Sequence, residues 1–160
     1  MKISEKIKQR LKEAGIRYHS NDNIADYINE GELQELQNEV AESFAGVLDS
    51  LVIDTDNDHN TQDTARRVAK MYVKEVFGGR FVQPPKVTAF PNMGYKSLYT
   101  SGPISIRSTC AHHFQNIVGK CWVGIVPNGE VIGLSKFNRI VHHIAAVSYT
   151  HLTLPTKVYV

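Results

Sequence analysis

The sequence is poor in the residues and patterns that mark several classes of protein. Only two of its 160 residues are cysteines, Cys110 and Cys121, which is too few for a disulfide-rich secreted scaffold. No apolar run approaches the roughly 20 residues that span a bilayer, and the N-terminus lacks the apolar core of a signal peptide. The net charge of +2 gives no indication of nucleic-acid or membrane binding. We therefore expect a reduced, cytoplasmic protein with neither kind of partner.

The remaining composition is that of an ordinary globular protein, and its first half carries helical signals. Hydrophobic residues make up 42% of the chain, and the length suits one domain with a core. Helices are predicted over residues 4–14, over an amphipathic run at residues 32–51, and over residues 62–77, where Gly78-Gly79 ends the pattern. The first helix has few apolar residues, so we expect an arm that needs a partner.

The second half carries strand signals. Alternating or β-branched runs occur at residues 86–90, 95–99, 103–109 and 117–126. The sequence PNGE at residues 127–130 predicts a hairpin turn, after which Ser135 is expected to cap a last helix. Helices followed by antiparallel strands and a further helix predict an α+β fold.

A polar segment, DTDNDHN at residues 54–60, carries alternating carboxylates. Calcium loops of the EF-hand type share that feature, but they also need a central Gly and a late Glu, and neither is present here. We therefore predict a solvated loop.

A cluster of cysteine and histidine, STCAHHF at residues 108–114, indicates possible metal chemistry. Cys110 and His113 are three residues apart, and a tight loop can aim such a thiolate and imidazole at one zinc ion. A catalytic zinc usually has three protein ligands, so these two are an incomplete set. His112 stands between them, and histidine is a common side chain for proton transfer. The alternative is a buried cysteine beside two surface histidines.

Two pairs of basic residues have the spacing of a phosphate site. Lys136 and Arg139 lie three residues apart just after Ser135, where a helix N-terminus offers free N–H groups. Arg67 and Lys70 have the same spacing on the helix predicted at residues 62–77. The alternative is that each pair is a solvated basic face.

Three segments together resemble the GTP cyclohydrolase I family. They are STCAHHF, VGKCWVGIVPNGEVIGLSKFNRIV and DTARRVAKMYVKEVFGG, and the resemblance covers residues 33–146. It implies a tunnelling fold whose antiparallel sheets join around a ring, in a decamer of two face-to-face pentamers. It also implies hydrolytic opening of the imidazole ring of GTP, which yields formate and 7,8-dihydroneopterin triphosphate for folate, biopterin or 7-deazaguanine pathways.

The resemblance also implies residue roles. Cys110 and His113 would be zinc ligands, and His112 would transfer protons beside the purine. Zinc suits this role because it can activate water near neutral pH. The residues expected to bind the substrate, mainly through its triphosphate, are Ser135, Lys136, Arg139, Arg67 and Lys70.

The chain departs from the family pattern in two places. Ala111 stands where the family often has Glu. After residue 146 the expected Gln-Glu-Arg-Leu-Thr and His-x-Cys segments, which carry guanine recognition, a second histidine and the third zinc ligand, are replaced by a tail that resembles translated sequencing-adapter DNA. We therefore expect a helical arm and connector at residues 1–31, a partial family domain at 32–146 and a foreign tail at 147–160. The fold is then incomplete at its C-terminus, and the chain weakly active or inactive. The alternative is that the tail is genuine and has diverged.

Two competing interpretations remain. One is a non-catalytic ligand-binding or ring-assembly protein of the same fold. The other is a related tunnelling-fold enzyme such as a pterin synthase or nitrile reductase, against which the CAHH and GLSK elements argue.

Overall fold

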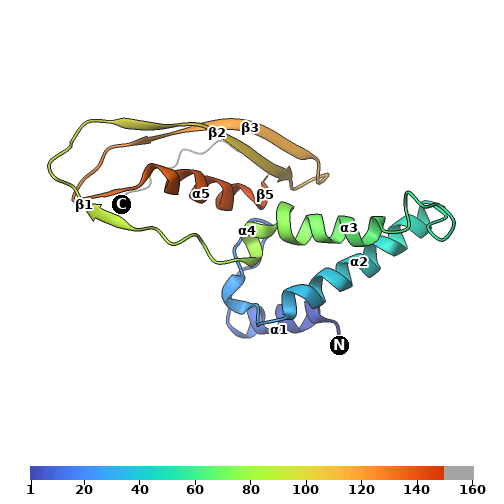
Figure 1. Ribbon diagram of the computed structural model, residues 1–160. Helices are drawn as coiled ribbons and strands as arrows, with labels where there is room; N and C mark the ends of the chain where they lie inside the picture. Colours follow the sequence, from blue (N-terminus) through green and yellow to red (C-terminus); the bar gives the residue numbers. More distant parts are fainter. Residues whose placement is uncertain (150–160) are drawn as a thin grey trace. The chain divides into compact units, whose positions relative to one another are not determined.

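A computed structural model describes residues 1–149 and divides the chain into two compact units, residues 1–83 and residues 84 onward (Figure 1). The first unit contains α1 (Ile3–Glu13), the 3-10 turn η1 (Ala25–Tyr27), α2 (Glu32–Ser50), α3 (Thr64–Met71), the π-helical turn η2 (Tyr72–Val76) and α4 (Gly78–Phe81). The second contains β1 (Ala89–Pro91), β2 (Tyr99–Cys110), β3 (Asn116–Ile125), β4 (Glu130–Ile132), α5 (Leu134–Ala145) and β5 (Ser148–Tyr149). This content confirms the α+β class.

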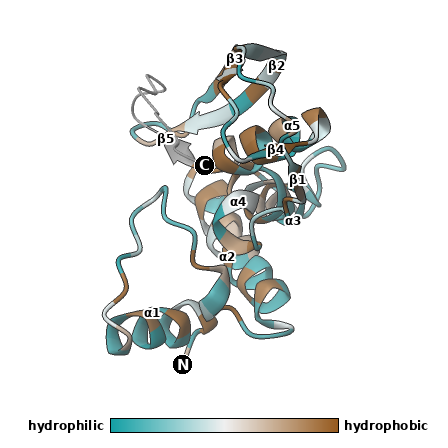
Figure 2. Ribbon diagram, turned by 90° about the vertical axis from the view of Figure 1, so that its left-hand side faces the viewer, coloured by the Kyte–Doolittle hydropathy of each residue, from teal (hydrophilic) through white to brown (hydrophobic). Residues whose placement is uncertain are grey.

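Helix α1 buries its apolar face inside the first unit. Ile3, Ile7 and Leu11 recur every four residues, which places them on one side of the helix, and all three are buried together with Ile24. The alternating teal and brown along α1 in Figure 2 shows the same amphipathic character. The helix predicted to be an arm in need of a partner therefore finds that partner within its own unit.

Polar contacts fix α1 to α2. Arg10 forms a two-pronged ion pair with Glu32, with N–O distances of 2.7 and 2.9 Å, and also donates to the Tyr27 carbonyl. At the start of α1, the Ser4 hydroxyl donates to the Glu39 carboxylate at 2.5 Å. Two-pronged arginine–carboxylate pairs are strong and geometrically specific, so they set how the two helices dock.

The helix predicted over residues 62–77 begins at Thr64 and changes to a π-helical turn at Tyr72. Such turns are uncommon. Here the Tyr72 ring stacks between Phe44 of α2, at a centroid distance of 5.5 Å, and Phe77, at 6.0 Å. The helical pattern ends before Gly78 as predicted, but Gly78 then begins the short helix α4.

Strands β2 and β3 form the main antiparallel pair of the second unit. Their register runs from Tyr99 opposite Ile125 to Thr109 opposite Asn116, with an irregularity between Ser101 and Ile104. Strand β5 adds to β2 in parallel, beside residues 109–110.

Two local strand predictions were wrong. Residues 95–98 form no strand, and residues 127–130 do not turn a hairpin, because β4 pairs with β1 rather than with β3. The turn chemistry at 127–130 is local, whereas the choice of β1 as partner depends on contacts about 40 residues away in sequence.

Helix α5 lies against β2 and supplies the core of the second unit. Phe137 and Ala145 of α5 are buried, as are Ile104 of β2 and Val147. The Phe137 ring also meets Tyr99 edge-on at a centroid distance of 6.3 Å. The predicted helix is therefore confirmed, but its N-cap is Gly133 and not Ser135.

The described part of the chain has no helix with the length and apolar content needed to cross a membrane. Of the tail predicted to be foreign, residues 150–160 lie outside the described residues. The boundaries predicted at residues 31 and 146 stay predictions.

Candidate active site

The Cys/His cluster lies in the short connection between β2 and β3. Cys110 ends β2, and its backbone N–H donates to the Gln115 carbonyl at 2.9 Å while its carbonyl accepts from Phe114 N–H at 2.9 Å. These two bonds close the loop, so His112 and His113 are carried on a tight connection at the end of a rigid strand pair. The predicted position of the cluster, between two strands, is confirmed.

The loop brings Cys110 next to His112. The Cys110 Sγ and His112 Nδ1 atoms are 3.7 Å apart, and the His112 and His113 ring centroids are 6.2 Å apart. Both histidines are exposed and Cys110 is half-buried. The thiol thus contacts His112, whereas the resemblance assigns His113 as its co-ligand, so that assignment stays a prediction.

The chemistry of the loop suits zinc, but the number of donors is too small. Zinc–sulfur and zinc–nitrogen bonds of about 2.3 and 2.0 Å at a tetrahedral angle place two ligand atoms about 3.6 Å apart, and a thiol and an imidazole here lie at that spacing. Within residues 1–149, however, no three cysteine, histidine or acidic side chains are grouped closely enough to hold a metal.

Cys121 does not complete the cluster. It lies opposite Ile104 on β3, six residues along β2 from Cys110, which corresponds to about 20 Å. A disulfide needs α-carbons within about 7 Å, so the two thiols cannot pair within one chain. Both cysteines are free, and burial raises the pKa of the Cys121 thiol.

The second predicted group lies at the N-terminal end of α5. Ser135 and Arg139 are exposed, and the Lys136 ammonium, which is half-buried, donates to the Lys86 carbonyl at 3.4 Å. No side chain caps this helix end, so its first N–H groups remain available to an anion.

These two groups lie far apart in one chain. Helix α5 runs alongside β2, and the chain after it joins the far end of that strand, where the Ser108 hydroxyl donates to the Val147 carbonyl at 2.8 Å (Figure 1). The nine residues from Lys136 to Ala145 alone span about 14 Å of helix. Cys110 therefore lies near the end of α5 opposite to Lys136.

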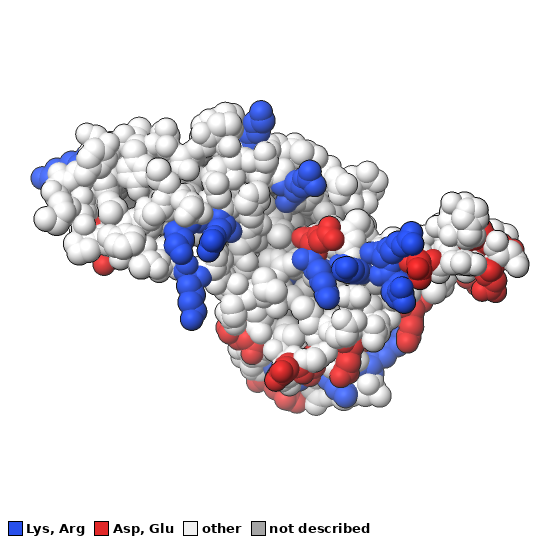
Figure 3. All heavy atoms as spheres, viewed as in Figure 1, with Lys and Arg blue, Asp and Glu red and all other residues white. Residues whose placement is uncertain are grey.

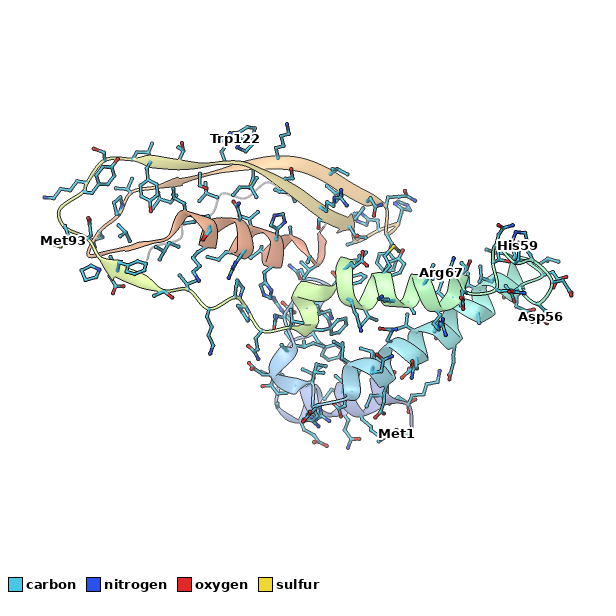
Figure 4. The ribbon with its side chains drawn as sticks, in the orientation of Figure 1. Met1, Asp56, His59, Arg67, Met93 and Trp122 are labelled. Carbon is cyan, nitrogen blue, oxygen red and sulfur yellow. The ribbon has the colours of Figure 1, made fainter. Side chains whose placement is uncertain are left out.

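The third predicted group belongs to the first unit. Arg67 and Lys70 are exposed on α3, and Arg67 lies 3.7 Å from the Asp63 carboxylate. Figure 3 shows Lys and Arg side chains gathered over this helix, and Figure 4 labels Arg67. Lys74 is also exposed and follows Lys70 by four residues, but it was not predicted as a site residue with Arg67 and Lys70. Its spacing could have identified it, because residues four apart on a helix lie on the same face.

Comparison with known proteins agrees with the resemblance. The family model described as GTP cyclohydrolase I matches residues 40–154. GTP cyclohydrolase 1 of Vibrio vulnificus strain YJ016 is 39% identical over 119 residues, which cover 73% of this chain and 54% of the relative.

Two further relatives have the same name. GTP cyclohydrolase 1 of Yersinia enterocolitica is 43% identical over 108 residues, covering 66% of this chain and 49% of the relative. That of Yersinia pseudotuberculosis serotype O:1b is 47% identical over 90 residues, which cover 55% of this chain and 41% of the relative. The chain thus spans about half the length of the curated relatives it matches.

Proposed function

The chain belongs to the GTP cyclohydrolase I family, and on that basis we propose that it is built to open the imidazole ring of GTP by hydrolysis. The products are formate and 7,8-dihydroneopterin triphosphate, in pterin biosynthesis. The observation that supports the proposal is the Cys110–His112–His113 loop, held at the end of a strand pair by two backbone hydrogen bonds. We place the protein in the reducing cytoplasm, which suits its two free thiols.

The proposed site residues have three different chemical roles. Cys110 and His113 would hold zinc, and the chemistry that zinc would supply is a nucleophile near neutral pH, by lowering the pKa of water. His112, exposed beside Cys110, moves protons at the purine. The cationic side chains and the uncapped start of α5 bind the triphosphate through charge-assisted hydrogen bonds, from Ser135, Lys136, Arg139, Arg67 and Lys70.

The same geometry supports a proposal of self-association. One chain holds Cys110 and Lys136 near opposite ends of α5, so a single nucleotide reaches both groups more readily when they come from different copies. Within the described residues, β3 pairs only with β2, which leaves its other edge open to a further strand. We propose a ring-shaped homo-oligomer in a tunnelling fold, a decamer where the family sequence is complete.

A non-catalytic protein of the same fold is the second candidate. It is favoured by the lack of a third metal ligand near Cys110 within residues 1–149. Zinc on two ligands binds weakly because the full ligand set supplies the affinity. We therefore expect the 160-residue chain to turn over GTP slowly at best.

The test is incubation of the chain with GTP and zinc, followed by fluorescence of the oxidised pterin and by zinc analysis of the protein. GTP cyclohydrolase 1 of Vibrio vulnificus serves as the positive reaction. We expect Cys110→Ser to remove at least 90% of any turnover and to lower bound zinc, because it removes a thiolate ligand, whereas Cys121→Ser keeps both near the parent values.

The outcomes separate the two candidates. Zinc-dependent pterin formation that Cys110→Ser abolishes supports the enzyme. GTP binding without pterin, at any zinc concentration, supports the non-catalytic protein. Equal turnover in Cys110→Ser and the parent chain would show that the role given to Cys110 is wrong.

A further inference from the structure

The face of the β2–β3 pair turned away from α5 carries an exposed tryptophan beside two cations. Alternation along the strands places Ile104 and Ile106 toward α5, and Ser105 and Arg107 away from it. On β3 the matching outward residues include Lys120 and Trp122. Figure 4 shows Trp122 on the side of the sheet opposite α5.

The register sets the spacing of the charged groups. Arg107 lies opposite Val118, and Ser105 lies opposite Lys120. Arg107 and Lys120 are therefore diagonal neighbours, about 7–8 Å apart at their α-carbons. Both side chains are exposed, and neither forms an ion pair with another described residue.

Trp122 is held in place although it is 63% exposed. Its Cδ1 atom would be 2.7 Å from a β-carbon at position 102, so the ring rests against the bare backbone of Gly102. Trp122 is also two residues from Lys120 on the same face of the strand. A rigid, exposed ring beside cations is the arrangement on which proteins stack nucleobases.

The charge of the second unit favours an anionic ligand. Among residues 84–149 there are six basic side chains and one acidic one, a formal charge of +5. The single acid, Glu130, lies on β4, which pairs with β1 and is not part of the β2–β3 pair. The tryptophan face therefore has no carboxylate of its own to compete with a phosphate.

We propose that this face binds purine nucleoside triphosphates, with the base stacked on Trp122 and the phosphates on Lys120 and Arg107. The surface lies on the opposite side of the sheet from α5, so it is distinct from the substrate-binding group at Lys136 and Arg139. It does not depend on whether the chain hydrolyses GTP.

The experiment uses the fluorescence of Trp122, the only tryptophan in the chain. GTP, ATP, guanosine and inorganic triphosphate are titrated into the 160-residue protein at low salt. We expect saturable quenching by both nucleoside triphosphates at millimolar or lower concentration, weaker quenching by guanosine, and competition without comparable quenching by inorganic triphosphate.

Variants that remove one charge each test whether Lys120 and Arg107 contribute to the nucleotide affinity. Lys120→Gln and Arg107→Gln are each expected to weaken binding about four-fold at low salt, the effect of one charge about 5 Å from a phosphate in water. At roughly 0.5 M salt the difference should largely vanish because the charges are screened. Lys96→Gln, which removes the same charge from the exposed loop before β2, is the matched control and should leave the affinity unchanged.

Three results would overturn the proposal. One is the absence of saturable quenching up to about 10 mM nucleotide. Another is an equal loss of affinity in Lys96→Gln, or complete loss in Lys136→Gln, which would assign the binding to overall charge or to the α5 group. The third is a shift of Trp122 emission to shorter wavelength as protein concentration rises, which would show that a second copy of the chain covers the face.

Discussion

The ion pair between Arg10 and Glu32 should contribute to the free energy of unfolding of the first unit. The hydrogen bonds from Arg10 lower the pKa of Glu32 from 4.5 to about 2, against the opposing effect of burial. A depression of that size corresponds to ~3 kcal/mol of folding free energy. Because the Arg10 side chain is 31% exposed and partly screened by water, we expect Glu32→Gln to cost about 2 kcal/mol at pH 7.

The pH dependence has a definite sign. The pKa of Glu32 is lower in the folded chain than in the unfolded one, so its contribution is complete above about pH 4.5 and is lost as the pH falls toward 2. The difference in unfolding free energy between the parent chain and Glu32→Gln should therefore shrink as the pH is lowered from 7 to about 3. Urea unfolding followed by far-ultraviolet circular dichroism measures it, because α1, α2 and α3 supply most of the helical signal.

Glu35→Gln is the matched control. Glu35 lies in the same first turn of α2 and is exposed, so it shares the helix-dipole contribution but not the Arg10 contact. A cost in Glu32→Gln as small as that in Glu35→Gln, or a difference that does not change with pH, would refute the reasoning. In an Arg10→Gln background the Glu32 substitution should cost clearly less, since its partner is already gone.

Two further outcomes are expected in the second unit. Gly102→Ala should cost about 1–3 kcal/mol and shift Trp122 emission, because the new methyl group would lie 2.7 Å from the ring and 2.9 Å from the Cys121 carbonyl. Gly119→Ala, whose methyl group meets nothing within 4 Å, should have neither effect. Titration of the zinc-free chain with a thiol reagent, without reductant, should count two free thiols in each chain, with Cys110 reacting faster because burial raises the pKa of Cys121. A monomeric chain with a Cys110–Cys121 disulfide would contradict the register of β2 and β3.

Sequence patterns predicted the elements whose causes are local. The apolar spacing of residues 32–51 corresponds to α2, and the β-branched run at 117–126 corresponds to β3, each within one residue at its ends. In both segments the periodicity of the side chains matches the period of the backbone, so the pattern itself specifies the structure. The loop of Cys110 followed from the same logic, because it joins two segments that were each recognisable as strands.

Contacts between distant segments were not predictable in this way. The attachment of α1 rests on Arg10 and Ser4, which contact residues 22 and 35 positions away, and a helix with only three inward apolar residues gives no local sign of that partner. The pairing of β1 with β4 is of the same kind. Each side chain has several possible partners of matching charge or shape, and only the completed packing selects one.

The distance between the Cys/His loop and Lys136 depends on the short connection after Ala145. This connection has no helical or strand periodicity in its sequence. After Ala145 the backbone turns so that β5 joins β2 beside Cys110, and this fixes the C-terminal end of α5 near the Cys/His loop. Because a helix is rigid, the Lys136 end must then lie about 14 Å or more away. If the Cys/His loop and the start of α5 act on one nucleotide, as proposed, the separation favours a site built from different copies of the chain, and mixing Lys136→Gln with Cys110→Ser protein should then restore part of the turnover that each variant lacks alone.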